Sequence, residues 1–432
     1  MTKIITKHFD EPRLHELETY RKLGGYVALK KALSMKPAEI ADEVKKSNLR
    51  GLGGAGFYAA VKWGTLPPLD KVPGPRYVVG NCDESEPGCF RDRVHVERAP
   101  HQVLEGLLIV SYAVGAGEAF IFIRGEYGRQ HRVLRAAVEE ARAAGLIGDK
   151  ILGSPFSCNI MLMRGAGTYI SGLDTALLES MEGKKSWPRQ PPPFPTNFGL
   201  MGFPTVVHNV ATLAMVPHIV ANGGEWFAKI GTPKCGGTML YSVSGHVEKP
   251  GVYELPMGAT LRALLDAAGG VRKGRRLKAV IPGGTSTPPL GPEHLDLPLD
   301  FETVRAQGSG LGAGGVIVLD ETADMVEVCR DIIGFLTHES CGQCTPCREG
   351  SAWTKRILER MLSGRGLPGD PANLERIAGN VTGKTICALG DTVGIVLKAY
   401  LTKFREEFRR LASPAGKQAQ VCRDAVSKGA TI

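Results

Sequence analysis

The first half of the chain alternates between two kinds of apolar segment. Short runs of branched and aromatic residues predict strands, and longer segments with apolar residues every three or four positions predict helices. The expected order is helix 101–114, strand 119–123, helix 129–144 and strand 159–163. Alternation of this kind is typical of a parallel or mixed sheet with helices on its faces. The pattern therefore predicts a Rossmann-like α/β domain with a mixed sheet.

The residues before this alternation predict further helices and one more strand. Residues 12–47 have helical periodicity in pieces, and the segment 37–46 opens on a proline, with acidic residues early and lysines late, as the helix dipole favours. A short helix is expected at 57–63. An apolar strand at 76–79 should lead into a loop that starts at Gly80.

The composition changes near residue 231. Strands that alternate like a hairpin, an amphipathic helix and returning strands predict a small α+β module, and helices follow from residue 325 onward. The expected organisation is an α/β domain with N-terminal helices over 1–235, an α+β module over 236–320, a helical bundle over 321–412 and a disordered tail over 413–432.

Composition and charge exclude several classes of protein. The chain has 432 residues, of which 43% are hydrophobic and 22% charged, which is typical of a globular protein of several domains. The net charge is +9, but residues 403–432 hold seven Lys/Arg against three Asp/Glu, so the excess is not gathered as nucleic-acid binding requires. The most apolar segment, 103–123, is interrupted by Glu105 and Glu118, which argues against membrane insertion. Residues 1–11 lack the apolar segment of a secretion signal.

A cysteine-rich stretch carries the clearest chemistry. Cys341, Cys344 and Cys347 are spaced three residues apart, and Cys387 offers a fourth thiolate. Three ligands from a tight loop and one from a distance are typical of a [4Fe–4S] cluster. A structural zinc site is the alternative, although its cysteines usually come as two separated pairs. Disulfides are disfavoured in a chain without a secretory signal.

A glycine-rich loop suggests a phosphate site. Four glycines fall within six positions and let backbone N–H groups approach a phosphate: Gly51, Gly53, Gly54 and Gly56. Lys62 adds a positive charge on the helix that follows. A helix rather than a strand is expected before the loop, so the dinucleotide fingerprint is incomplete, and a tight turn between two helices is the alternative.

An acidic loop follows the strand at 76–79. Asn81 precedes three closely spaced carboxylates, Asp83, Glu84 and Glu86, at the strand end where α/β sheets bind ligands. Such carboxylates could accept hydrogen bonds from the ring N–H and hydroxyl groups of a flavin. The alternative is a solvated acidic loop that nearby arginines neutralise.

A second glycine-bearing loop, 165–169, follows the strand at 159–163 and leads to an expected helix at 171–182. The proline run at 187–195 predicts an extended surface or pocket-wall loop. Phe194 within it could either stack on a planar ring or cover the core.

Taken in order, the two glycine loops, the acidic loop and the cysteine set resemble the NADH-binding flavoprotein subunit of respiratory complex I, and the resemblance covers about residues 24–404. It extends to the diaphorase subunits of NAD-linked hydrogenases and formate dehydrogenases. The resemblance implies FMN and a [4Fe–4S] cluster as cofactors and NADH as substrate. It also implies a ubiquitin-like middle module and a helical bundle that holds the cluster.

The resemblance implies roles residue by residue. Gly51, Gly53, Gly54 and Lys62 would hold the FMN phosphate region, and Asn81, Asp83 and Glu84 would line the flavin. Glu86 and Phe57 would face the nicotinamide, with Glu86 as the group nearest the transferred hydride. Asp174 stands where the family binds the adenosine ribose and repels the extra phosphate of NADP. The second flavin-contact stretch corresponds to Tyr169, Gly172, Asn209 and Thr212.

The partners implied are a thioredoxin-like [2Fe–2S] subunit and additional iron–sulfur subunits, in the peripheral arm of a membrane complex on its cytoplasmic side. Since a hydride delivers two electrons and a cluster accepts one, a flavin is needed between them. We therefore expect electrons to pass from NADH to FMN and then to the cluster. An alternative is the diaphorase subunit of a soluble hydrogenase or formate dehydrogenase.

Several positions depart from the family pattern. The family usually has arginine at Leu52, proline at Tyr58, and asparagine at His208. It also has lysine at Pro191 and glutamates at Leu173 and Ala211. These changes motivate a further alternative, a divergent relay or structural subunit that no longer oxidises NADH.

Overall fold

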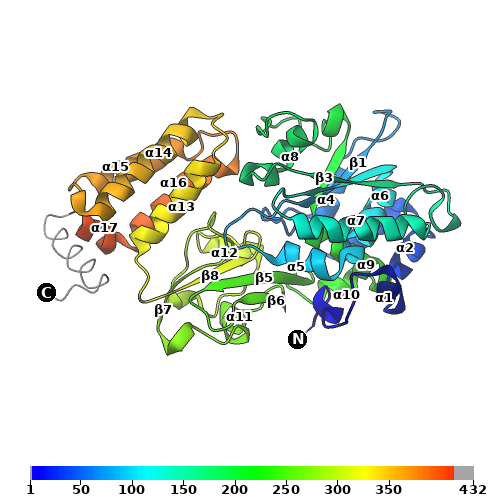
Figure 1. The fold of residues 1–432 in the computed structure, drawn as a ribbon, viewed down its shortest axis with the longest axis horizontal. Coiled ribbons are helices and arrows are strands. Elements are labelled where there is room, and N and C mark those ends of the chain that lie inside the picture. The colour runs from blue at the N-terminus through cyan, green and yellow to red at the C-terminus, as the bar shows by residue number, and fades with distance from the viewer. Residues whose placement is uncertain (1, 413–432) are drawn as a thin grey trace.

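The computed structural model describes residues 2–412 and has three parts (Figure 1). The cysteine-bearing helical bundle lies at one end, the α/β domain at the other, and the second module beneath and between them. Across residues 2–412, no helix has both the length and the apolarity that a membrane span requires. The predicted tail, 413–432, lies outside the described residues.

The first sheet has four parallel strands in the order β3-β2-β1-β4. The strands are β1 Tyr77–Cys82, β2 Glu118–Ile123, β3 Asn159–Arg164 and β4 Thr205–Asn209. Their side chains alternate between two cores, so that Val78 faces one core and Val79 the other. The α/β prediction is confirmed, with a sheet that is entirely parallel.

Helices cover both faces of this sheet. The N-terminal helices are α1 Leu17–Lys22, α2 Val27–Ala32, α3 Pro37–Lys46 and α4 Ala59–Gly64. Those that follow are α5 Arg91–Arg98, α6 Pro100–Val114, α7 Gly128–Ala143, α8 Asp174–Met181, α9 Val210–Asn222 and α10 Gly224–Ala228. α6, α7 and α9 share one core with the sheet, whereas α8 packs on the opposite face.

Two predicted boundaries differ from the structure. β1 continues to Cys82 instead of ending at Val79, because Asn81 and Cys82 still pair with β2. Gly80 permits this continuation, since a Cβ there would lie 3.1 Å from the Leu213 side chain of α9. The helix expected at 171–182 begins only at Asp174, after a 3₁₀ turn over Tyr169–Gly172.

The second module is a mixed four-stranded sheet in the order β6-β5-β8-β7. Its elements are β5 Thr238–Gly245, β6 Gly251–Pro256, α11 Leu261–Ala267, β7 Leu277–Ile281, α12 Phe301–Ala306 and β8 Gly315–Asp320. The central pair, β5 and β8, is parallel and both outer pairs are antiparallel. A hairpin, a helix and a parallel central pair form the ubiquitin-like arrangement that the resemblance implied.

The third part is a bundle of helices around its own apolar core. Its helices are α13 Met325–Glu339, α14 Thr345–Arg360, α15 Asp370–Val381, α16 Ala388–Lys403 and α17 Arg405–Leu411. The Asp324 side chain caps α13 by accepting hydrogen bonds from the N–H groups of Val326 and Glu327. Cys341 lies between α13 and α14, and Cys387 immediately precedes α16.

The packing of α6 on α9 depends on Gly106, where an added Cβ would lie 1.9 Å from the carbonyl oxygen of Leu213. We predict that Gly106→Ala lowers the free energy of unfolding by about 1–3 kcal/mol, because the helices must separate. The matched control is Gly379→Ala in α15, where nothing lies within 4 Å of the added Cβ. Urea unfolding measures both variants, and equal midpoints would contradict this account of the packing.

Candidate functional site

The site lies where the strand order of the first sheet reverses. β1 leads by crossovers to β2 and β3 on one side, while β4 lies on its other side. Asn81 of β1 and Asn209 of β4 face each other in register at the carboxyl ends of these strands. Ligands of open parallel sheets bind in the crevice at such a switch point. The sequence-predicted Asn81 and Asn209, 128 positions apart in the chain, are thus brought together.

The first glycine loop closes over this crevice. The Gly51 N–H donates to the Phe57 carbonyl at 2.7 Å, and the Leu52 N–H donates to the Thr212 hydroxyl at 2.8 Å. A Cβ on Gly53 would lie 3.1 Å from the Cβ of Asn209, so a larger residue would push the loop away. The loop therefore lies against the start of α9, whose positive end favours anions.

The second module also contacts this glycine loop, through α12. Gly56 has φ +65°, and the Phe301 ring of α12 occupies the place of its missing side chain. Arg50 donates to the Gly56 carbonyl at 2.7 Å and forms an ion pair with Glu302. Phe57, at the end of the loop, is half exposed. The chain thus supports the loop backbone and leaves an aromatic ring at its edge.

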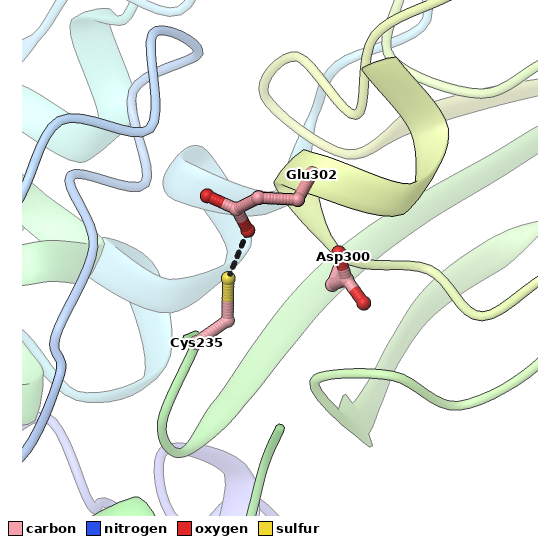
Figure 2. Close-up of side chains that lie close together, drawn as sticks. All are labelled: Cys235, Asp300 and Glu302. Carbon is pink, nitrogen blue, oxygen red and sulfur yellow. Dashed lines mark hydrogen bonds between the residues drawn. The ribbon is translucent and has the colours of Figure 1, made fainter. Parts of the chain in front are cut away.

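One group of potential metal ligands, Cys235, Asp300 and Glu302, lies beside this support (Figure 2). Glu302 is already paired with Arg50 and accepts a hydrogen bond from the Cys235 thiol at 3.2 Å. Asp300 caps α12, because it accepts from the N–H and hydroxyl of Thr303 at 2.8 Å each. The three side chains therefore have structural partners within the protein.

Lys62, the predicted phosphate ligand, donates to Asp174 at 2.9 Å and to the Val207 carbonyl at 2.8 Å. The predicted phosphate-binding and ribose-binding residues thus form one ion pair, which the sequence did not reveal. Both side chains are partly exposed, so the pair is open to competition from other charged groups.

Asp83 is the member of the acidic loop with an unused acceptor. One of its oxygens accepts from the Ser85 hydroxyl, whereas Oδ2 is buried without a partner among the described residues. Burial raises the pKa of Asp83 to about 6. A ligand that donates a hydrogen bond would satisfy Oδ2 and favour the carboxylate. This orphaned oxygen fits a flavin, which has such donors.

Glu84 makes its contacts within the protein. Its carboxylate accepts from the N–H groups of Asp92 and Arg93 at the start of α5 and from the Tyr127 hydroxyl. Burial raises its pKa. The solvated-loop alternative is wrong for this residue, because Glu84 is buried.

Glu86 joins the α/β domain to the second module. The Tyr169 hydroxyl donates a hydrogen bond to a Glu86 carboxylate oxygen at 2.5 Å. The other carboxylate oxygen accepts from the Thr285 hydroxyl at 3.0 Å and the Ser286 N–H at 2.7 Å. Burial raises the pKa of Glu86, although these three donors favour its ionised form.

The same segment reaches the cysteine loop. The Tyr169 N–H donates at 2.9 Å to Glu339, the last residue of α13, and the Tyr169 ring packs edge-on against Phe335. The next residue, Ile170, lines the cavity of the four cysteines. Two consecutive residues thus contact both predicted redox sites. The Asn81 side chain of β1 donates to the carbonyl of Gly172, in the same segment, at 2.8 Å.

The four predicted ligands line one cavity: Cys341, Cys344, Cys347 and Cys387. Cys344 and Cys387 directly precede α14 and α16, and Cys347 lies in the first turn of α14. Helix N-termini stabilise thiolates. Burial nevertheless raises the pKa values of Cys347 and Cys387, whereas coordination to a metal would favour their thiolate forms.

The sulfur spacing favours a cluster over a single zinc ion. No three of these sulfur atoms, all within the described 2–412, lie within 4.8 Å of one another. Sulfurs bound about 2.3 Å from a tetrahedral zinc ion would be about 3.8 Å apart. In a cubane the four cysteines bind different irons, so their sulfurs are not held to the spacing around a single ion.

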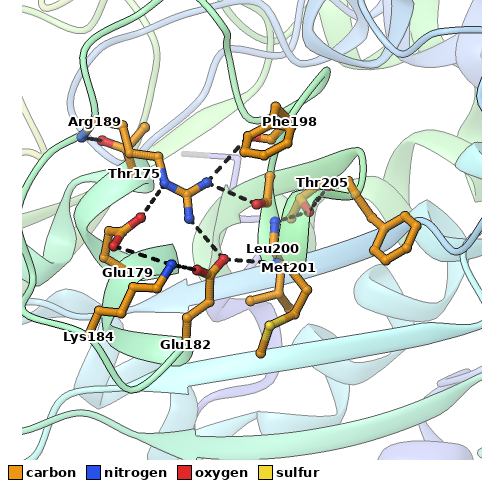
Figure 3. A network of polar contacts seen from close by, with 11 residues as sticks. Thr175, Glu179, Glu182, Lys184, Arg189, Phe198, Leu200, Met201 and Thr205 are labelled. Atoms are coloured by element: carbon orange, nitrogen blue, oxygen red, sulfur yellow. Dashed lines mark hydrogen bonds and ion pairs between the residues drawn. The ribbon is translucent and has the colours of Figure 1, made fainter.

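The proline-rich loop is held by an arginine that the sequence analysis did not single out (Figure 3). Arg189 forms ion pairs with Glu179 at 2.5 Å and Glu182 at 2.8 Å and donates to the Gly199 carbonyl at 2.9 Å. The signal was present, because Glu179 of α8 and Glu182, the residue after its end, are three positions apart and so lie on the same side. Phe194 in this loop is exposed, so it does not cover the core.

Comparison with known proteins agrees with this geometry. Residues 44–218 match the family model of the Nuo51 FMN-binding domain, residues 240–290 match the SLBB domain, and residues 327–411 match the NADH-ubiquinone oxidoreductase-F iron-sulfur binding region. The NADH-quinone oxidoreductase F subunit 2 of Rhizobium meliloti is 49% identical over 408 residues, covering 94% of this chain and 96% of the relative. The NADH-quinone oxidoreductase F subunit of Mycobacterium tuberculosis is 47% identical over 413 residues, covering 94% and 93%.

Among solved structures, the NAD⁺-reducing [NiFe]-hydrogenase in its H₂-reduced state resembles the chain with a TM-score of 0.82 and 31% identity. The match covers 100% of this chain and 72% of that one.

Fold and site define a flavin- and iron–sulfur-binding oxidoreductase subunit. Within that class, the chain belongs to the family of NADH-quinone oxidoreductase F subunits. The resemblance read from the motifs is confirmed, and so are FMN and the [4Fe–4S] cluster as cofactors. The predicted activity, that of the NADH dehydrogenase flavoprotein which feeds electrons into the complex, is confirmed with them.

Arg189 yields a structural prediction. Arg189→Lys should speed amide hydrogen exchange over residues 187–201 at least about tenfold. The planar guanidinium donates charge-assisted hydrogen bonds to two glutamates at once, and a lysine ammonium cannot replace both. The control is Arg262→Lys, which makes the same exchange at an exposed pair with Asp296 in the second module and should leave exchange over 187–201 unchanged. Unchanged exchange over 187–201 would show that other contacts hold the loop.

Proposed function

We propose that NADH and FMN meet at the β1/β4 switch point and that electrons leave through a cluster held by Cys341, Cys344, Cys347 and Cys387. When bound, the flavin accepts the hydride as two electrons and the cluster takes them singly. The observation that carries the proposal is the pair Tyr169 and Ile170. Tyr169 bonds Glu86 in the flavin crevice, while Ile170 lines the cysteine cavity.

The flavin-binding residues divide into two groups by what they do. Gly51 shapes the glycine loop through its N–H bond to the Phe57 carbonyl, and the backbone of Gly53 and Gly54, together with the start of α9 at Asn209 and Thr212, provides the anion site for the phosphate. Asn81, Asp83, Tyr169 and Gly172 border the crevice along the strand ends, and Asp83 Oδ2 accepts from the flavin. Glu84 acts through its cap on α5, as a positioning residue.

Glu86 and Phe57 are assigned to the nicotinamide. Phe57 offers an exposed ring for stacking beside the glycine loop. Glu86 accepts hydrogen bonds from three donors, which favour its ionised form and hold the carboxylate at a fixed position, so we assign it a positioning role and not proton transfer. Phe194 offers a second exposed ring, on the loop that Arg189 holds.

Asp174 is assigned to nucleotide selectivity. Its carboxylate is held by Lys62 and partly exposed, while Leu173 beside it offers no charge. A carboxylate at this point repels the extra phosphate of NADPH. Because a bound phosphate competes for Lys62, occupation of the flavin site frees Asp174 for the ribose.

The partners follow from the same electron path. A single cluster needs an acceptor, and we assign this role to a thioredoxin-like [2Fe–2S] subunit, with additional iron–sulfur subunits after it. The relatives are subunits of a quinone oxidoreductase, which supports a place in a peripheral arm. We assign that arm to the cytoplasmic side of the membrane.

Replacing one ligand tests the cluster assignment. Cys344→Ser should abolish the cluster's visible absorption and lower the iron content, while FMN stays bound, because the two sites use different residues. Cys329→Ala is the control, since Cys329 is buried in the same bundle core but does not line the cavity. Wild-type iron in Cys344→Ser would overturn the ligand set.

Asp174→Asn tests the selectivity assignment. The ratio of kcat/KM for NADPH to that for NADH should rise at least about tenfold, or about 1.4 kcal/mol. The substitution removes the carboxylate that repels the extra phosphate of NADPH, and it releases Lys62. Asp296→Asn removes an exposed carboxylate of the second module and should leave the ratio unchanged. An unchanged ratio in Asp174→Asn would place selectivity on another residue.

A further inference from the structure

The sulfur atoms of the cavity already receive hydrogen bonds from the chain. The Ile386 N–H donates to Cys344 Sγ at 3.4 Å, and the Ser340 hydroxyl lies 3.3 Å from Cys347 Sγ. The N–H groups of Leu389 and Gly390 are directed to Cys387 and lower the pKa of its thiol against the larger effect of burial. Such donors stabilise negative charge on sulfur and so affect the reduction potential of a cluster.

Gln343 stands apart from these groups. It lines the same cavity, between Cys341 and Cys344, and its side-chain oxygen is buried without a donor. Across residues 2–412, the side-chain amide of Gln343 takes part in no hydrogen bond. A buried, unpaired oxygen costs about 1–3 kcal/mol. Here it also lies beside a site whose four thiolates repel it.

Rotating the Gln343 side-chain amide by a half-turn removes the repulsion between its oxygen and the thiolates. It exchanges the oxygen for the NH₂ group without moving any other atom of the side chain, since the two ends are nearly equal in shape. The buried position then carries a donor in the cavity that the four cysteines line, and the oxygen takes the place of the NH₂ group. The amide thus has a favourable arrangement only when an acceptor fills the cavity.

We propose that the Gln343 side-chain amide donates a hydrogen bond to a sulfur of the bound cluster and raises its reduction potential. The reduced cluster carries one more negative charge than the oxidised cluster, so a donor stabilises it more. Gln343 is therefore a tuning residue, which favours electron flow from the flavin into the cluster. This proposal rests on the cysteine ligand set proposed above.

Gln343→Met tests it, because methionine keeps the length of the side chain and lacks an N–H donor. The full chain is loaded with FMN, iron and sulfide and titrated anaerobically, with the cluster followed by electron paramagnetic resonance. The one-electron equilibrium constant for cluster reduction should fall at least about threefold, or about 30 mV at 59 mV per tenfold change. The FMN potential should not change. Pulsed electron paramagnetic resonance after exchange into D₂O should show one fewer deuteron coupled to the cluster than in the wild type.

Gln307→Met is the matched control, since Gln307 is exposed in the second module, and its cluster potential should equal that of the wild type. If Gln343→Met loads no cluster, Gln343→Leu provides the comparison. A loaded variant with unchanged potential and deuteron couplings overturns the tuning role. Wild-type protein without iron and sulfide overturns instead the ligand set on which the proposal rests.

Discussion

Two carriers that exchange electrons must be held close together, and in this chain that requirement falls on the contact between the Tyr169 segment and the end of α13. Glu339 accepts the Tyr169 N–H one residue before the cysteine loop begins, and Ile170 enters the cavity of that loop. Trp187 adds a hydrogen bond from its ring N–H to the Cys341 carbonyl at 3.2 Å. Because these contacts fall on the cysteine loop or on the residue just before it, they set its position relative to the α/β domain more directly than packing elsewhere in the bundle.

The second module has a comparable role on the other side of the crevice. It supplies Thr285 and Ser286 to Glu86, Phe301 to Gly56 and Glu302 to Arg50. A four-stranded parallel sheet leaves its carboxyl-end loops unsupported, and loops without packing partners are the least stable parts of a fold. The module therefore acts as a support that keeps the glycine loop and the acidic loop in fixed relative positions.

Much of this could be predicted from sequence because it depends on local pattern. Helix and strand periodicity predicted the α/β domain, and cysteine spacing predicted four ligands that indeed line one cavity. What escaped prediction depends on contacts between distant segments. The Lys62–Asp174 pair joins residues of different helices, and the three donors of Glu86 come from two modules. The length of β1 was also missed, since Gly80 suggests a turn until α9 is seen to pack against it. No local pattern encodes such pairings.

The central claim is that hydride from NADH enters a flavin in the α/β domain and leaves as single electrons through the four-cysteine cluster. Anaerobic addition of NADH to the chain, loaded with FMN, iron and sulfide, tests it most directly when flavin absorbance and the cluster's paramagnetic signal are followed together. The account predicts that the flavin bleaches and that the cluster signal of the reduced state appears with it. Bound FMN that does not bleach, despite an intact cluster, would contradict the account and identify a relay subunit that no longer oxidises NADH.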